Sequence, residues 1–167
     1  MSNLILLAED SYDDALFFKR ALKKAGVQNP VHVVSDGAQA IAYILGDGFY
    51  ADRERFPEPS IVFLDLIMPR ADGWVVLNWL STQANKYNLF VIVMTGAGEI
   101  SQMGDAYSMG AHSFVFKPIQ AAEIKALIEY WPARWMLKGK QNKRATAVPT
   151  QTAIENLRKS AGREKSC

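Results

Sequence analysis

The fold is decided by the stretch IVFLDLIMP, which occupies residues 61–69. A short, continuous apolar run that ends in a turn residue is typical of a strand buried on both faces, as in a parallel sheet. Asp65 interrupts this run, and a carboxylate is costly to bury unless cations or hydrogen bonds compensate it. We therefore expect Asp65 to lie at the carboxyl end of the strand, to be paired with cations, or both. That edge of an α/β sheet is where ligands bind.

A second apolar run, residues 4–8, also ends in acids, Glu9 and Asp10. Together with Asp65, they can place three carboxylates around one small volume. Their repulsion would raise at least one carboxyl pKa unless a divalent cation lies between them, and Mg²⁺ prefers oxygen ligands of this kind. The alternative is that Glu9 and Asp10 simply begin the next helix, where the helix dipole favours acids.

Two later apolar runs end in a hydroxyl and an ammonium. Residues 90–94 are followed by Thr95, and residues 113–116 are followed by Lys117 and a proline that ends the strand. Each has an ordinary explanation, as a strand threonine or a solvated lysine. With the three acids, however, they form a set suited to phosphoryl transfer onto a carboxylate. Metal and ammonium would neutralise the phosphoryl oxygens, and the hydroxyl would donate a hydrogen bond.

This combination resembles the receiver domain of two-component response regulators, over about residues 3–137. The motifs that carry the resemblance, with the family's spacing, are Glu9-Asp10, Asp65 with Met68-Pro69 and Asp72-Gly73, Thr95-Gly96, and Lys117-Pro118.

The resemblance implies a flavodoxin-like (βα)5 fold, a doubly wound parallel sheet of strand order 2-1-3-4-5 in a three-layer sandwich. The alternation of apolar runs with amphipathic segments predicts the α/β class by itself, but it does not fix this order. Residues 46–60 resemble an insertion found in the stand-alone receivers of bacterial phytochrome systems. The segment is either a packed surface loop, which is the simpler interpretation, or a loop that binds a partner.

The resemblance also implies roles for the acids. Asp65 is the phosphoacceptor, which takes a phosphoryl group from a phosphohistidine of a histidine kinase or phosphotransfer protein. Asp10 binds Mg²⁺ directly, Glu9 holds a metal-bound water, and the backbone carbonyl of Ile67 is a further ligand. The apolar side chain of Ile67 lies near the path of attacking water and predicts slow loss of the phosphoryl group. No other cofactor is expected.

Lys117 is expected to pair with Asp65 at rest and with the phosphoryl group afterwards. Thr95 is the expected trigger of the switch, and Phe114 would rotate into the space that Thr95 vacates, unless it is an ordinary core aromatic. Asp13 and Asp14 follow the acidic pair on the first helix, where we expect them to be solvated or to face a kinase.

Cap and turn residues predict the helices. Ser11 and Gly26 delimit a helix over 12–25, Asp36 caps a helix through Leu45, and a strand lies at 31–34 between them. The remaining helices are expected at 74–81, 100–109 and 121–131.

Composition indicates one globular domain, residues 1–137, followed by a basic tail, residues 138–167. The first holds 11 Lys and Arg against 15 Asp and Glu, and the tail holds 8 against 2. The tail is polar and predicted to be disordered. No apolar run is long enough to cross a bilayer, no basic segment precedes the first run, and Cys167 is the single cysteine. We therefore expect a cytoplasmic protein without disulfides.

With no effector domain recognisable after Trp135, the phosphorylated surface itself is expected to signal, by binding a partner or by dimerising through the last helix and strand. Trp131 is expected to pack on the core and Trp135 to be exposed at a dimer seam.

The leading hypothesis is a phosphoacceptor signalling protein, not an enzyme. A haloacid-dehalogenase-type phosphatase would need a second acid two residues after Asp65, where Ile67 stands. Two further hypotheses are a nucleic-acid regulator that uses the basic tail and an adaptor that works without phosphorylation.

Overall fold

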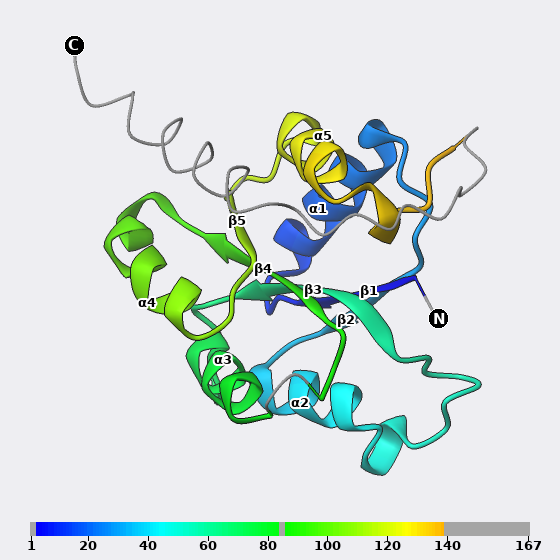
Figure 1. Ribbon diagram of the computed structural model, residues 1–167, viewed down its shortest axis with the longest axis vertical. Helices are drawn as coiled ribbons and strands as arrows, with labels where there is room; N and C mark the ends of the chain where they lie inside the picture. The colour runs from blue at the N-terminus through cyan, green and yellow to red at the C-terminus, as the bar shows by residue number, and fades with distance from the viewer. Residues whose placement is uncertain (1–2, 84–85, 139–167) are drawn as a thin grey trace.

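One parallel sheet of five strands forms the middle layer of the molecule (Figure 1). In this computed structural model, which describes residues 3–83 and 86–138, the strand order is β2-β1-β3-β4-β5. This confirms the order that the family resemblance implied. The strands are β1 (Leu4–Ala8), β2 (Val31–Val34), β3 (Pro59–Asp65), β4 (Phe90–Thr95) and β5 (Ser113–Phe116).

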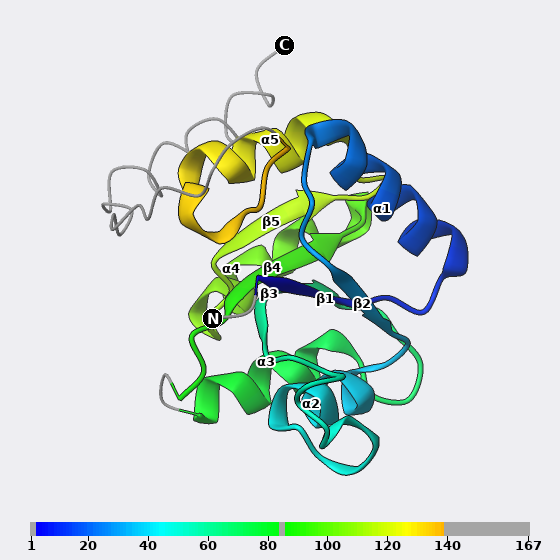
Figure 2. The ribbon, with the colours of Figure 1, turned by 90° about the vertical axis from the view of Figure 1, so that its right-hand side faces the viewer.

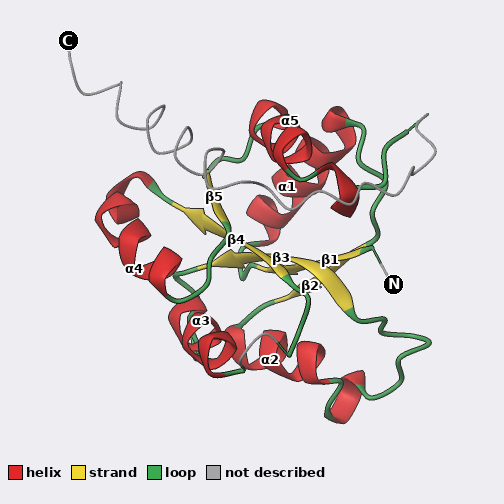
Figure 3. Cartoon of the chain, in the orientation of Figure 1, coloured by secondary structure: helices red, strands yellow, loops and turns green. Residues whose placement is uncertain are grey.

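Helices cover both faces of the sheet, as the ribbon and the side view show (Figures 1 and 2). One face carries α1 and α5, and the other carries α2, α3 and α4; Figure 3 shows helices and strands alternating along the chain. Their bounds are α1 (Tyr12–Ala25), α2 (Gly37–Leu45), α3 (Gly73–Thr82), α4 (Met103–Ser108) and α5 (Ala121–Tyr130). Single-turn 3₁₀ segments are η1 (Gly48–Tyr50) and η3 (Pro132–Arg134), and a longer one is η2 (Ala97–Gln102).

Successive residues of the central strands enter opposite apolar cores, which explains why these strands read as continuous apolar runs. On β3, Val62 and Leu64 belong to the core under α2 and α3, whereas Ile61 and Phe63 belong to the core under α1 and α5. All four side chains are fully buried. Asp65 follows them in the same strand, so the chain delivers a carboxylate from the interior to the edge of the sheet.

Capping residues set the boundaries of α1 and the start of α2, as the sequence predicted. Ser11 accepts a hydrogen bond from the Asp14 backbone N–H at 3.2 Å, and Gly26 ends α1 with φ of 83°. Asp36 accepts one from the Gln39 N–H at 2.8 Å and begins α2. These cap residues satisfy backbone groups that lack partners within the helix. The predicted spans of α1 and the strand at 31–34 are confirmed.

The expected helix over 100–109 is wrong at its start. Residues 97–102 form the 3₁₀ segment η2, and the α-helix begins only at Met103. No side chain caps this helix, since Gln102 makes no cap hydrogen bond. Without a cap, the sequence carries no signal for where the backbone changes from 3₁₀ to α-helical hydrogen bonding.

Trp135 is not exposed at a surface seam, which corrects our expectation. Its side chain is 1% exposed and its ring lies 6.3 Å from that of Phe63 in the core under α1 and α5. Pro132 begins the turn η3. The chain then returns to the segment between α1 and β2, where Val27 forms an antiparallel bridge with Leu137. The expected core packing of Trp131 is confirmed, because its ring packs at a tilt against that of Phe90, with the centroids 4.5 Å apart.

The insertion at residues 46–60 is a packed loop. Tyr50 and Phe56 are buried, with ring centroids 4.9 Å and 6.1 Å from that of Tyr43 on α2. Arg53 donates hydrogen bonds to the carbonyls of Tyr43 and Ile44 at 2.9 and 2.8 Å. The insertion therefore closes the carboxyl end of α2, whose last carbonyls have no partner within the helix.

We predict a disordered basic tail, and its residues 139–167 lie outside the described range. Within that range, no helix combines the length and apolarity needed to cross a membrane.

Candidate functional site

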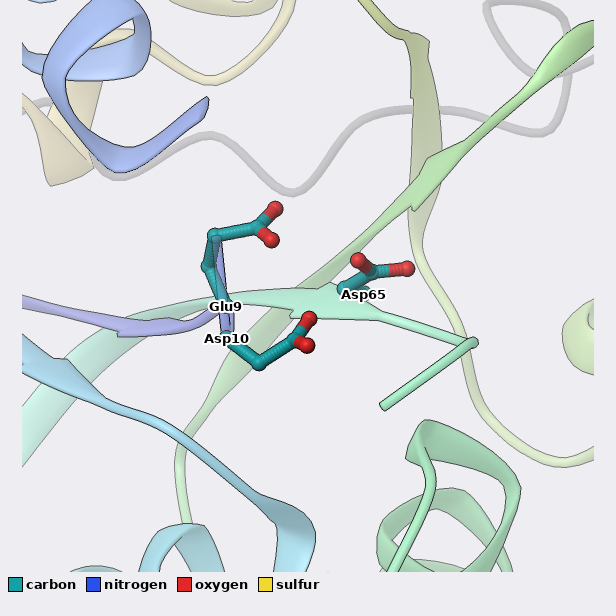
Figure 4. A group of neighbouring side chains, drawn as sticks. All are labelled: Glu9, Asp10 and Asp65. Carbon is teal, nitrogen blue, oxygen red and sulfur yellow. The ribbon is translucent and has the colours of Figure 1, made fainter. Parts of the chain in front are cut away.

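Three carboxylates meet at the carboxyl edge of the sheet, as expected from the two acid-ending strands. Asp65 ends β3, and Glu9 and Asp10 follow β1, its hydrogen-bonded neighbour. Among the described residues these three form a group whose carboxylate oxygens lie within 4.8 Å of one another. Figure 4 shows the side chains of Glu9 and Asp10 extending toward the side of the site where Asp65 lies. Glu9 and Asp65 are only 3% and 5% exposed, whereas Asp10 is open to solvent.

Lys117 brings a positive charge to this group from the end of β5. Its Nζ lies 2.5 Å from Asp65 Oδ2 and 2.6 Å from Glu9 Oε2. Burial alone would lower the pKa of Lys117, but hydrogen bonds to these two carboxylates outweigh it and raise the pKa above its ordinary value. The ammonium therefore stays charged and compensates the carboxylate that interrupts β3.

Backbone N–H groups fix the remaining carboxylate oxygens. The Ile67 N–H donates to Asp65 Oδ1 at 3.0 Å, and the Ser11 N–H donates to Glu9 Oε1 at 3.0 Å. Burial nevertheless raises the pKa of Glu9, and hydrogen bonds from Lys117 and Ser11 oppose this only in part. Glu9, Asp14 and Asp65 thus share one ammonium, that of Lys117.

The family model of the response regulator receiver domain matches residues 5–129. The chain belongs to this family.

This chain is similar to several response regulators over most of their length. A response regulator in red light signaling of R. palustris is 33% identical, covering 82% of this chain and 99% of that one, with a TM-score of 0.70. The bacteriophytochrome response regulator RtBRR is 28% identical, covering 96% and 91%, with a TM-score of 0.72. The chemotaxis protein CheY of Bacillus subtilis is 31% identical, covering 67% of this chain and 86% of its own.

Receiver domains bind Mg²⁺ or Mn²⁺ at an acidic site, and the acidic cluster of this receiver fits such an ion. Its donors are all oxygens, which suits a hard dication, and the exposed Asp10 leaves an open side for water ligands. Glu9, Asp10 and Asp65 are therefore brought together as predicted.

The two expected switch residues lie on β4 and β5. Thr95 ends β4, one residue beyond Met94, which pairs with Asp65 across the sheet. Its hydroxyl is buried and donates to the Gly96 carbonyl at 3.2 Å, and its own carbonyl accepts from the Lys117 N–H at 2.9 Å. Phe114 is half-buried, and its ring meets that of Tyr107 edge-on at 4.4 Å.

Asp14 is the residue that sequence reasoning missed. We expected it to be solvated or to face a kinase, but its Oδ2 lies 3.4 Å from Lys117 Nζ. The two residues are 103 positions apart, and they meet because the first turn of α1 and the residue after β5 approach each other at the carboxyl edge of the sheet. An acid in the first turn of a helix has a sufficient local explanation in the helix dipole, so no sequence signal marked it.

Proposed function

We propose that this receiver accepts a phosphoryl group from the phosphohistidine of a histidine kinase or phosphotransfer protein onto Asp65, in a reaction that depends on Mg²⁺. The observation that carries the proposal is the contact between Lys117 and Asp65 at 2.5 Å, directly beside the three-carboxylate cluster. Membership of a family of signalling proteins supports this chemistry, as does a carboxylate that lies beside a compensating ammonium at one edge of the sheet.

In the proposed transfer, an oxygen of Asp65 attacks the phosphorus in line with the phosphorus–nitrogen bond of the donor. That bond breaks as the new phosphorus–oxygen bond forms, and its electron pair returns to the imidazole, which leaves neutral because its other nitrogen carries a proton. The ammonium of Lys117 stabilises the negative charge on the phosphoryl oxygens, and the Ile67 N–H keeps the Asp65 carboxylate oriented.

Glu9, Asp10, Asp65 and the backbone carbonyl of Ile67 are the residues that we assign to holding Mg²⁺. The bound ion supplies neutralisation of the charge that gathers between phosphate and carboxylates. Oxygens alone make up this assigned ligand set, and its three carboxylates come together from two adjacent strand ends.

We assign the output to the Thr95 hydroxyl, which would leave the Gly96 carbonyl for a phosphoryl oxygen, and to an inward rotation of Phe114. The half-buried position of Phe114 gives its ring a path inward, because it already touches the core at one edge. The rearranged surface then binds a protein partner or a second copy of the chain.

Intact-mass spectrometry after incubation with acetyl phosphate tests the function. We expect one added phosphoryl group when Mg²⁺ is present, none with a chelator, and none in Asp65→Asn. Asp13→Asn, which removes an exposed acid of α1, is the matched control and should label like the wild type. Labelling of Asp65→Asn to the same extent would refute Asp65 as the acceptor.

A further inference from the structure

Lys117 has three carboxylate partners among the described residues, and they are not equivalent. Asp65 and Glu9 contact its ammonium at 2.5 and 2.6 Å and belong to the group that can share a cation. Asp14, at 3.4 Å, lies outside that group. The three donors of the ammonium thus face two acids of the cluster and one acid at its border.

A dication in the cluster changes the balance among these contacts. It withdraws negative charge from Glu9 and Asp65, and it repels the ammonium beside them. Of the three acids, only Asp14 does not share its negative charge with the dication, so its attraction for Lys117 is undiminished. Its side chain is 43% exposed, so it has room to follow the ammonium, whereas the carboxylates of Glu9 and Asp65 are almost fully enclosed.

Asp14 is also well anchored at its backbone. Its N–H donates to the Ser11 side chain at the start of α1, and α1 packs against α5 next to the end of β5. The backbone of Asp14 is therefore held in place at the border of the site, and its side chain can move with the ammonium of Lys117.

We propose that Asp14 is a positioning residue for Lys117: it holds the ammonium beside Asp65 when Mg²⁺ takes over Glu9 and Asp65. This rests on the proposed function of Asp65 as phosphoacceptor. Without Asp14, Lys117 pairs with the two cluster acids alone. Mg²⁺ must then displace a cation that has no other partner, and the displaced ammonium is poorly placed for the incoming phosphoryl group.

The first test compares rates of phosphorylation by acetyl phosphate over a range of Mg²⁺ concentrations in the full chain. We expect Asp14→Asn to need about tenfold more Mg²⁺ for its half-maximal rate and to have a lower maximal rate. Asp14→Glu, which restores the charge, should recover most of both. Asp13→Asn removes the same charge from the neighbouring position, but Asp13 is exposed and is not a partner of Lys117, so this variant should stay within about twofold of the wild type.

The second test measures Mg²⁺ affinity without phosphorylation, from NMR shifts of the Ile67 amide. Lys117→Met should bind Mg²⁺ more tightly than the wild type, because a competing cation is gone. Asp14→Asn should weaken binding in the wild-type background and have little effect when combined with Lys117→Met. Equal weakening in both backgrounds would overturn the proposal, since it would show that Asp14 acts on the metal by its field alone.

The two levels of the proposal fail differently. If the wild type is not labelled at Asp65, the proposed function fails. If it is labelled and Asp14→Asn behaves like Asp13→Asn, the function stands and the role of Asp14 is refuted.

Discussion

Ile67 is the residue that we expect to set the lifetime of the phosphorylated state. Its N–H donates to Asp65 Oδ1, which fixes its position, while its side chain is 64% exposed. The site thus presents a hydrocarbon beside the carboxylate that we propose to be phosphorylated. A hydrocarbon cannot orient a water for attack on phosphorus, so the acyl phosphate should be long-lived.

Replacing Ile67 with Gln should shorten the life of the phosphorylated protein by about threefold to tenfold, because an amide can position the attacking water. The decay is followed on phosphate-affinity gels after the donor is removed. Ile67→Leu keeps the hydrocarbon and serves as the control. A wild-type lifetime of only seconds, or equal decay of the Gln and Leu variants, would contradict this account.

We expect His32 to make the stability of the protein depend on pH. Burial of its ring against Tyr43, at a centroid distance of 4.6 Å, lowers its pKa below 6.5, and Lys19 acts in the same direction. The unfolded chain therefore binds the proton first as pH falls, so the contribution of His32 to stability is complete above about pH 6.5 and is lost below it.

We predict that the free energy of unfolding drops more between pH 7.5 and 5.5 in the wild type than in His32→Gln. Urea denaturation at both values measures the difference, in which the other titrating groups cancel. An identical drop in the two proteins would show that His32 titrates as it does in the unfolded chain.

At the scale of elements, the start of α3 is tied to the phosphoacceptor strand. Gly73 donates its N–H to the Leu66 carbonyl at 3.1 Å, and a Cβ at this position would collide with the backbone carbonyl of Asp65. The first turn of α3 can approach the end of β3 this closely only because position 73 has no side chain.

Gly73→Ala should therefore lower the free energy of unfolding by about 1–3 kcal/mol and slow labelling of Asp65, since the backbone must shift. Gly104→Ala is the matched control. A Cβ there meets open space within α4, so alanine should stabilise the protein by about 0.5–1 kcal/mol. If the two variants were similarly stable, α3 would accommodate the added methyl group without displacing β3.

The elements show where sequence reasoning succeeds and where it stops. Apolar runs and capping residues are local signals, and they predicted the five strands and the two ends of α1. The acids of the cluster were predictable because parallel strands end at one edge. The contact of Asp14 with Lys117 and the burial of Trp135 were not, because each depends on how distant elements pack.

On the scale of the whole molecule, the segment after α5 completes the domain. The Gln28 N–H donates to the Met136 carbonyl at 2.7 Å, and Asn29 accepts from the Met136 N–H at 2.7 Å. With Trp135 inserted beside Phe63, these bonds join the end of the described chain to the segment that links α1 and β2. The boundary of the cooperative unit should therefore lie near Lys138, not at the end of α5.

We predict that a chain of residues 1–138 has a free energy of unfolding within about 0.5 kcal/mol of the full-length protein, because it keeps all of these contacts. A chain ending at Tyr130 should lose at least about 3–5 kcal/mol, the range for removing a large buried aromatic side chain, or fail to fold. Chemical denaturation of both, beside the full chain, gives the comparison. The same 1–138 protein serves as the control for nucleic-acid binding: if the full chain alone is retained on DNA at moderate salt, the basic tail carries that activity through phosphate contacts. A loss of more than about 1 kcal/mol in 1–138 would show that residues after Lys138 stabilise the receiver, and the domain boundary would then move toward the carboxyl end.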